Sequence, residues 1–276
     1  MRYNVNKFTE VTNINNGVFH VVSPGWSPSY IYIVEGSSRA LVIDTGYGIG
    51  NLKGLIEKIT TLPYDVVNTH FHGDHTLGNY QFTDVYIHKD DLVSCQKNID
   101  HKIRERFTEL PKKMDVPFTI NDYTAIAEYN LLPICEGQIF DLGGQYELEV
   151  VDAPGHTFGS ICLLDRKRRI LFTGDALVST PTFIFTMDNT LKKQATITIY
   201  MEAMKRLLLR SSDFDGLYPG HGELNISPNI IHEMIECCRE IINDPHVGID
   251  FNFGDNHVKL HRHGKASIAY TNDRIR

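Results

Sequence analysis

The sequence predicts an α/β fold in which strands and helices alternate along the chain. Runs of β-branched and aromatic residues, such as 30–34 and 40–44, end in glycine-containing turns. The segment 52–59 then places leucine and isoleucine at helical spacing, and a further strand is expected at 64–68. A histidine-rich stretch, 69–75, follows directly on that strand. Strands that alternate with helices in this way are typical of layered α/β proteins.

The N-terminal part is expected to be mostly β structure. A strand at 18–22 precedes the strands at 30–34 and 40–44, and turn-rich segments separate all three. The gap at 23–29 contains the only tryptophan, Trp26. Two interpretations stay open for this gap: a flap over a substrate site, or a hairpin loop in which the indole packs.

Residues 89–135 interrupt the alternation and are interpreted as a helical insertion. Ile103, Phe107 and Leu110 share one helical face, charged residues surround them, and no strand is expected before Ile139. The insertion could cap an active site, contact another subunit or decorate the surface.

The second half returns to strand-like patterns. Ser227 is a predicted N-cap, with Pro228 at the first helical position. The basic run 166–169 could be a phosphate or nucleic-acid patch, although a solvated turn at a hairpin tip is favoured. The predicted elements are strands at 85–88, 145–151, 161–164 and 170–173, a strand end at 217–219, helices at 200–208 and 228–242, and two more strands within 247–270.

Composition narrows the class of protein. Residues 1–276 are expected to form a single domain, and 42% hydrophobic with 22% charged residues is ordinary for a globular chain. The net charge of −7 argues against nucleic acid as the partner, and no apolar run is long enough to span a membrane. The N-terminus lacks the apolar core of a signal peptide, and the five cysteines form no C-x-x-C motif. A cytoplasmic location with reduced thiols is therefore expected.

The stretch after strand 64–68 has the pattern H-x-H-x-D-H. Its four candidate ligands are His70, His72, Asp74 and His75. Imidazole nitrogens and carboxylate oxygens suit zinc, and alternating positions 70 and 72 point the same way from an extended backbone. Gly73 lets the chain turn and aim the next two side chains elsewhere. One short loop can thus serve two adjacent metal positions.

Three further candidates follow the same design. His156, Asp175 and His221 each stand beside glycine where a predicted strand ends. Together with the histidine-rich loop they make seven candidate ligands at strand ends, which is what a dinuclear metal site needs.

These motifs resemble the metallo-β-lactamase superfamily, and within it the glyoxalase II-like hydrolases. The resemblance covers about residues 17–222 apart from the insertion, and it implies a four-layer αββα sandwich with two metals at one edge. The matching motifs are Asp44-Thr45-Gly46, His70-Phe71-His72-Gly73-Asp74-His75, Pro154-Gly155-His156-Thr157, Thr173-Gly174-Asp175 and Pro219-Gly220-His221-Gly222.

The resemblance also implies how the ligands are shared. His70, His72 and His156 would bind the first metal, Asp74, His75 and His221 the second, and Asp175 both. Asp44 would have a supporting role without being a ligand. The metals are expected to be zinc, with iron or manganese as alternatives. A hydroxide between them would attack the substrate, and Asp74 would be catalytic by orienting that nucleophile or relaying its proton.

Departures from the family pattern bear on the substrate. About fifty residues follow His221, and they do not read as the helical domain that grips glutathione in glyoxalase II. Ala176-Leu177-Val178 follows Asp175, where acyl-homoserine lactonases carry a tyrosine. The nucleic-acid modules of the RNA- and DNA-processing branches are not found.

We therefore expect a metal-dependent hydrolase acting on a small ester, thioester or lactone. A phosphodiesterase or nuclease of the same fold and a β-lactamase-like amide hydrolase are the alternatives. A small-molecule substrate is the expected partner, without nucleic acid or membrane, and a homodimer stays open.

Overall fold

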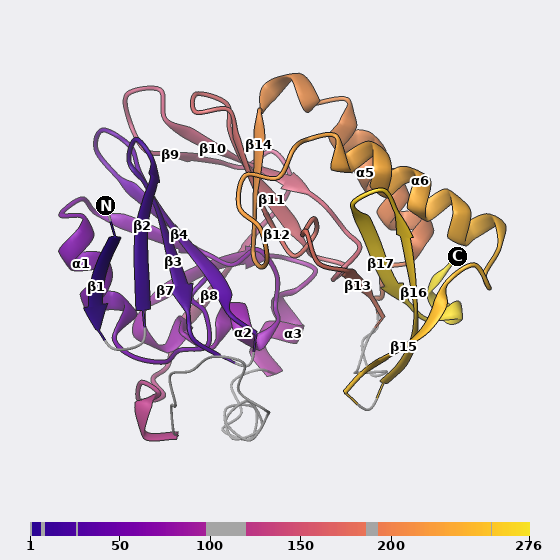
Figure 1. Cartoon of the computed structure of the whole chain (residues 1–276). Helices are drawn as coiled ribbons and strands as arrows, with labels where there is room; N and C mark the ends of the chain where they lie inside the picture. The colour runs from indigo at the N-terminus through magenta and orange to yellow at the C-terminus, as the bar shows by residue number, and fades with distance from the viewer. Residues whose placement is uncertain (1, 7–8, 26, 98–119, 186–192, 255) are drawn as a thin grey trace. The chain divides into compact units, whose positions relative to one another are not determined.

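Figure 1 shows the computed structural model of the chain. It describes residues 2–6, 9–25, 27–97, 120–185, 193–254 and 256–276. The chain divides into two compact units, Met1–Leu148 and Glu149–Arg276. Trp26 and the predicted helical face of Ile103, Phe107 and Leu110 lie outside the described residues, so those two predictions stay untested.

The first unit is built on an eight-stranded sheet whose strands follow one another in chain order, β1 to β8. Neighbours from β1 to β5 pair antiparallel, and those from β5 to β8 pair parallel. The strands are β1 (Arg2–Asn6), β2 (Thr9–Asn15), β3 (Val18–Ser23), β4 (Ser29–Glu35), β5 (Ala40–Ile43), β6 (Tyr64–Val67), β7 (Asp84–His88) and β8 (Asn130–Ile134).

Helix α1 (Leu52–Ile59) covers part of this sheet. The Asn51 side chain caps it by accepting a hydrogen bond from the Gly54 amide at 2.8 Å. Leu52, Leu55 and Ile56 then bury their side chains in a core shared with the strands. The short elements of this unit are α2 (Gly73–Thr76), η1 (Asn79–Gln81), α3 (Leu92–Lys97), η2 (Ile120–Asp122) and β9 (Ile139–Asp141).

Strand β8 contradicts the expectation that no strand precedes Ile139. It lies inside the segment 89–135 and pairs parallel with β7 over its whole length. The misleading residue is Pro133, which cannot donate to a ladder and argues against a central strand. Because β8 is last in the sheet order, it is an edge strand, where a proline is tolerated.

The second unit contains two sheets. Within the unit, the first has the order β14-β12-β11-β10, where β12 pairs antiparallel with β11 and parallel with β14. The predicted hairpin is therefore present, and its basic tip is confirmed as a turn. The strands are β10 (Glu147–Asp152), which begins at the boundary, β11 (Ile161–Asp165), β12 (Ile170–Gly174) and β14 (Gly216–Pro219).

The second sheet of this unit has the order β13-β17-β16-β15. Its strands are β13 (Thr182–Ile184), β15 (Ile249–Phe253), β16 (Asn256–His263) and β17 (Ala266–Tyr270), so the tail holds three strands where two were expected. Helices α5 (Ile197–Leu208) and α6 (Ile230–Asn243) run side by side along this sheet (Figure 1). They share one apolar core with it, and 3-10 turns η3 (Ser211–Asp213) and η4 (Asn272–Arg274) complete the unit.

Both units combine sheets with helices, which confirms the predicted α/β class. The five cysteines have free thiols, as expected from their spacing. Among the helices in the described ranges, none is long and apolar enough to cross a bilayer.

Candidate metal centre

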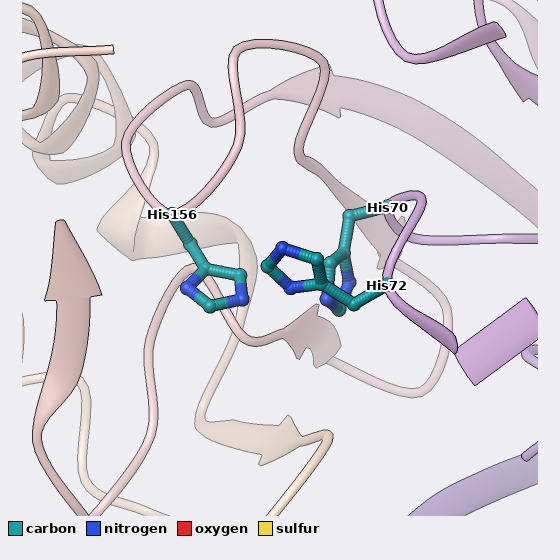
Figure 2. Close-up of side chains that lie close together, drawn as sticks. All are labelled: His70, His72 and His156. Carbon is teal, nitrogen blue, oxygen red and sulfur yellow. The ribbon is translucent and has the colours of Figure 1, made fainter. Parts of the chain in front are cut away.

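The histidine-rich loop begins where β6 ends and runs into α2. Ligand nitrogens of His70 and His72 lie within 4.8 Å of each other, and so do those of His70 and His75. Asp74 comes next to them, with its Oδ2 atom 3.6 Å from His75 Nε2. Figure 2 shows the rings of His70 and His72 on this loop, and draws with them His156 of the second unit. The first unit thus gathers four of the seven predicted ligands.

Asp44 organises this loop from the end of β5. One carboxylate oxygen accepts the Thr69 amide at 2.7 Å, and the other accepts the Thr69 hydroxyl at 2.8 Å and His75 Nδ1–H at 2.9 Å. Its backbone has φ of 62°, a left-handed conformation that aspartate adopts more readily than most residues. Asp44 therefore has the supporting role that the sequence motif implied.

These bonds determine where the ring protons lie on two histidines. Because the Thr69 hydroxyl donates to Asp44, its oxygen must accept from His70 Nδ1, 3.1 Å away. His75 Nδ1 donates to the carboxylate itself. In a neutral imidazole the other nitrogen, Nε2, then carries the lone pair that a metal needs.

Further polar side chains hold the backbone of the loop. The His75 carbonyl accepts from the Thr45 amide at 2.8 Å and from Asn68 Nδ2 at 3.1 Å. Asn79 links these two residues, because it accepts from the Thr45 hydroxyl at 2.7 Å and donates to Asn68 at 2.8 Å. Neither Asn68 nor Asn79 was predicted from the sequence to support the site. Their proximity to the motifs was the only signal, and it does not predict their pairing.

The second unit contributes three loops, each after a strand of its first sheet. His156 follows β10, Asp175 follows β12 and His221 follows β14. Gly155 allows the first loop to pass Tyr200, because a Cβ at position 155 would lie only 2.2 Å from that ring. The other two loops are tied together by the Gly220 amide, which donates to the Gly174 carbonyl at 2.8 Å.

The two histidines of this set converge on one carboxylate oxygen of Asp175. Asp175 Oδ2 lies 3.6 Å from His156 Nε2 and 3.5 Å from His221 Nε2. His156 donates its Nδ1 hydrogen to the Phe183 carbonyl oxygen at 2.9 Å, since a carbonyl can only accept. In the neutral ring, Nε2 of His156 therefore presents a lone pair to a carboxylate.

This geometry fits a metal ion. Two lone pairs that face each other repel unless a cation lies between them. A zinc ion with bonds of about 2.0–2.2 Å and tetrahedral angles holds its ligand atoms about 3.4 Å apart. The nitrogen–oxygen distances of 3.5–3.6 Å in both units agree with that spacing. They are too long for direct hydrogen bonds.

Comparison with known families identifies the same class of protein as the sequence motifs do. Residues 24–221 match the metallo-beta-lactamase superfamily, and the chain belongs to it. A metallo-beta-lactamase from Pontibacter korlensis has a similar structure, with a TM-score of 0.58 and 21% sequence identity, covering 83% of this chain and 97% of that one. The chain therefore has the metallo-β-lactamase fold that the motifs predicted.

Two curated relatives illustrate activities found on this fold. Acyl-coenzyme A thioesterase MBLAC2 of Homo sapiens is 32% identical over 161 residues, covering 53% of this chain and 57% of that protein. An atrochrysone carboxyl ACP thioesterase of Paecilomyces divaricatus is 27% identical, covering 75% of this chain and 55% of that protein. In both cases the match spans little more than half of the relative's length.

Proposed function

We propose that this chain hydrolyses thioesters with the help of two divalent metal ions. The observation that carries the proposal is the convergence of His156 and His221 on one oxygen of Asp175, at the spacing of metal ligands. Superfamily membership supports a hydrolase, and the two thioesterases among its relatives favour the thioester among the predicted substrates.

The ligands are proposed to be shared between two ions, which we take to be zinc, with iron or manganese as alternatives. His70, His72 and His156 would hold the first ion. Asp74, His75 and His221 would hold the second, and Asp175 would serve both. All seven are nitrogen or oxygen donors, which suits these metals.

When bound, such ions lower the pKa of a coordinated water from about 15.7 to about 7 and polarise the substrate carbonyl. The chain's own residues do the remaining work. Asp74 accepts and passes on the proton of the attacking water. Asp44 keeps the lone pairs of His70 and His75 on Nε2, and the Phe183 carbonyl does the same for His156.

The basic run at the β11–β12 turn gives little support to the phosphodiesterase alternative. Arg166 contacts Glu149 at 2.7 Å, Arg168 contacts Asp165 at 2.6 Å, and Arg169 contacts Asp215 at 2.6 Å. Arginines neutralised by neighbouring carboxylates make a weak electrostatic footprint for phosphates.

A substrate panel on one zinc-loaded sample tests the proposal. The panel comprises acetyl and octanoyl thioesters of coenzyme A, p-nitrophenyl acetate, bis-p-nitrophenyl phosphate and a chromogenic β-lactam. We expect the highest kcat/KM on a thioester, loss of that activity in a chelator, and its return with zinc. Preference for the phosphodiester or the β-lactam would replace the proposal by that alternative.

A pair of histidine variants shows whether the activity belongs to the proposed ligands. His156→Ala removes a proposed ligand, and we expect kcat to fall by about a hundredfold or more. His246→Ala removes an exposed histidine whose backbone amide donates to Asp244, and should leave the rate unchanged. Equal activity of the two variants would contradict the ligand assignment.

A further inference from the structure

One face of the second sheet of Glu149–Arg276 carries a cluster of phenylalanines. Strand register determines which side chains share this face. Phe183 pairs with Ala269 across β13 and β17, Ala269 pairs with Leu260, and Val258 pairs with Phe251. Phe253, two residues beyond Phe251, points to the same side. We call this surface, with Phe185 at the end of β13, the phenylalanine face.

The rings of this face contact one another. Phe183 lies 4.5 Å from Phe253 and 5.5 Å from Phe185, measured between ring centroids, and the third pair is 6.2 Å apart. These are distances of favourable aromatic contact. Phe183, Phe185 and Phe251 pack against the buried side chains of Val258, Leu260 and Ala269. The cluster is therefore a packed apolar wall.

Helices α5 and α6 take the opposite face of the same sheet. Ile268 and Tyr270, which alternate with Ala269 along β17, belong to the core shared with these helices. On that side, His261 and His263 of β16 contact Glu240 of α6 at 2.6 and 3.0 Å. The phenylalanine rings point the other way and are all half-buried, so part of each ring stays accessible.

The phenylalanine face is joined directly to a candidate metal ligand. His156 Nδ1 donates to the Phe183 carbonyl at 2.9 Å, so the residue that orients this histidine also supplies a ring of the wall.

We propose that the phenylalanine face binds the apolar acyl chain of the thioester and selects for long chains. The inference rests on the proposed function and adds the part of the substrate that the metal ligands do not select. Because His156 is hydrogen-bonded to Phe183, a thioester carbonyl at the metal centre would lie beside the Phe183 ring. The acyl chain would then continue over the other phenylalanine rings.

The test compares kcat/KM for acetyl and octanoyl thioesters of coenzyme A. Phe253→Ala removes a ring that contacts the Phe183 ring, without changing the Phe183 carbonyl that accepts from His156. Phe253→Leu keeps an apolar side chain, and Asn252→Ala changes an exposed neighbour on the opposite face of β15. Binding of dodecanoate to the zinc-loaded protein by calorimetry gives a readout that needs no turnover.

Wild-type protein is expected to prefer octanoyl over acetyl by at least tenfold, because each buried methylene adds to binding. Phe253→Ala should reduce that preference by about five- to tenfold, leave acetyl hydrolysis unchanged and weaken dodecanoate binding. Phe253→Leu should recover most of the preference, and Asn252→Ala should behave like wild type.

The outcomes separate this inference from the proposed function. Hydrolysis of both thioesters with a preference that Phe253→Ala does not change would overturn the acyl-binding role and keep the thioesterase. Absence of hydrolysis, with dodecanoate binding that Phe253→Ala weakens, would overturn the thioesterase and keep an apolar binding site. Absence of both would overturn both. A variant that only lowers Tm or changes oligomer size would assign the wall to packing or to a second copy of the chain.

Discussion

The replacement Asp44→Asn tests whether one buried carboxylate sets the proton positions on two candidate ligands. Asp44 is 1% exposed and accepts three hydrogen bonds, two from Thr69 and one from His75. Asparagine has one acceptor oxygen and one donor group, so at least one of these donors must face another donor. Asparagine also tolerates the positive φ of this position, so the backbone is conserved.

The size of the effect follows from the geometry. If the amide nitrogen faces His75, the ring must move its proton to Nε2, the nitrogen proposed to bind metal, or break its bond. Loss of such a partner weakens metal affinity by about 10–100-fold, which corresponds to about 1.4–2.8 kcal/mol. A buried donor left without an acceptor also lowers the free energy of unfolding by about 1–3 kcal/mol.

The assay is a zinc titration against a chromophoric chelator, with Tm measured on the metal-free protein. Asp165→Asn is a matched control, because Asp165 is equally buried and accepts from the Arg168 backbone and guanidinium. Both variants should lose stability, but only Asp44→Asn should lose zinc affinity. Wild-type zinc affinity in Asp44→Asn would refute the argument that this carboxylate orients a ligand.

Four further predictions concern the metal content, Asp175, His20 and Arg210. Elemental analysis of protein purified without chelator should find two metal ions per chain, and one metal with full activity would contradict the two-metal proposal. Asp175→Ala should reduce turnover by about a hundredfold while the protein stays folded. Burial lowers the pKa of His20 from 6.5 to about 4. As pH falls, the unfolded chain therefore binds a proton at His20 before the folded chain does, and the free energy of unfolding decreases. In urea unfolding at pH 4.5, His20→Phe should lose about 2 kcal/mol less of this free energy than wild type, each relative to its own value at pH 7. Arg210 donates two hydrogen bonds to Glu149 and lowers the pKa of that carboxyl; Arg210→Met should cost about 1 kcal/mol at pH 7, and the difference should shrink as pH falls below the pKa of Glu149.

The sequence predicted the elements that carry the candidate ligands because those signals are local. A strand followed by a glycine turn is visible within a few residues, and β5, β6, β10 and β12 were all found near their true bounds. Edge strand β8 was not, because Pro133 broke the pattern and only its pairing with β7 makes it a strand. Strand β13 is short and likewise depends on a distant partner, β17.

Positioning groups were harder to predict than ligands, because they act across long sequence separations. Thr45 and Asn79 are hydrogen-bonded to each other although 34 residues separate them. His156 is oriented by the backbone carbonyl of Phe183, and a carbonyl has no residue type that a motif could reveal. Only Asp44 was anticipated, because it belongs to a motif of its own. Sequence patterns thus identify donors to a metal better than the hydrogen bonds that orient them.

The candidate metal ligands and the apolar surface beside them bear on different properties of the substrate. Metal ligands define a reaction class, since the metallo-β-lactamase fold presents similar donors in proteins with different activities. Discrimination between substrates that share a reacting group has to come from surfaces that contact the rest of the molecule. In the second unit, Phe183 contributes both to the metal ligands and to the phenylalanine face, because its carbonyl orients His156 and its ring contacts Phe253. A substitution at Phe253 that alters acyl preference and leaves acetyl hydrolysis intact would separate the two roles, which a substitution at any ligand cannot do.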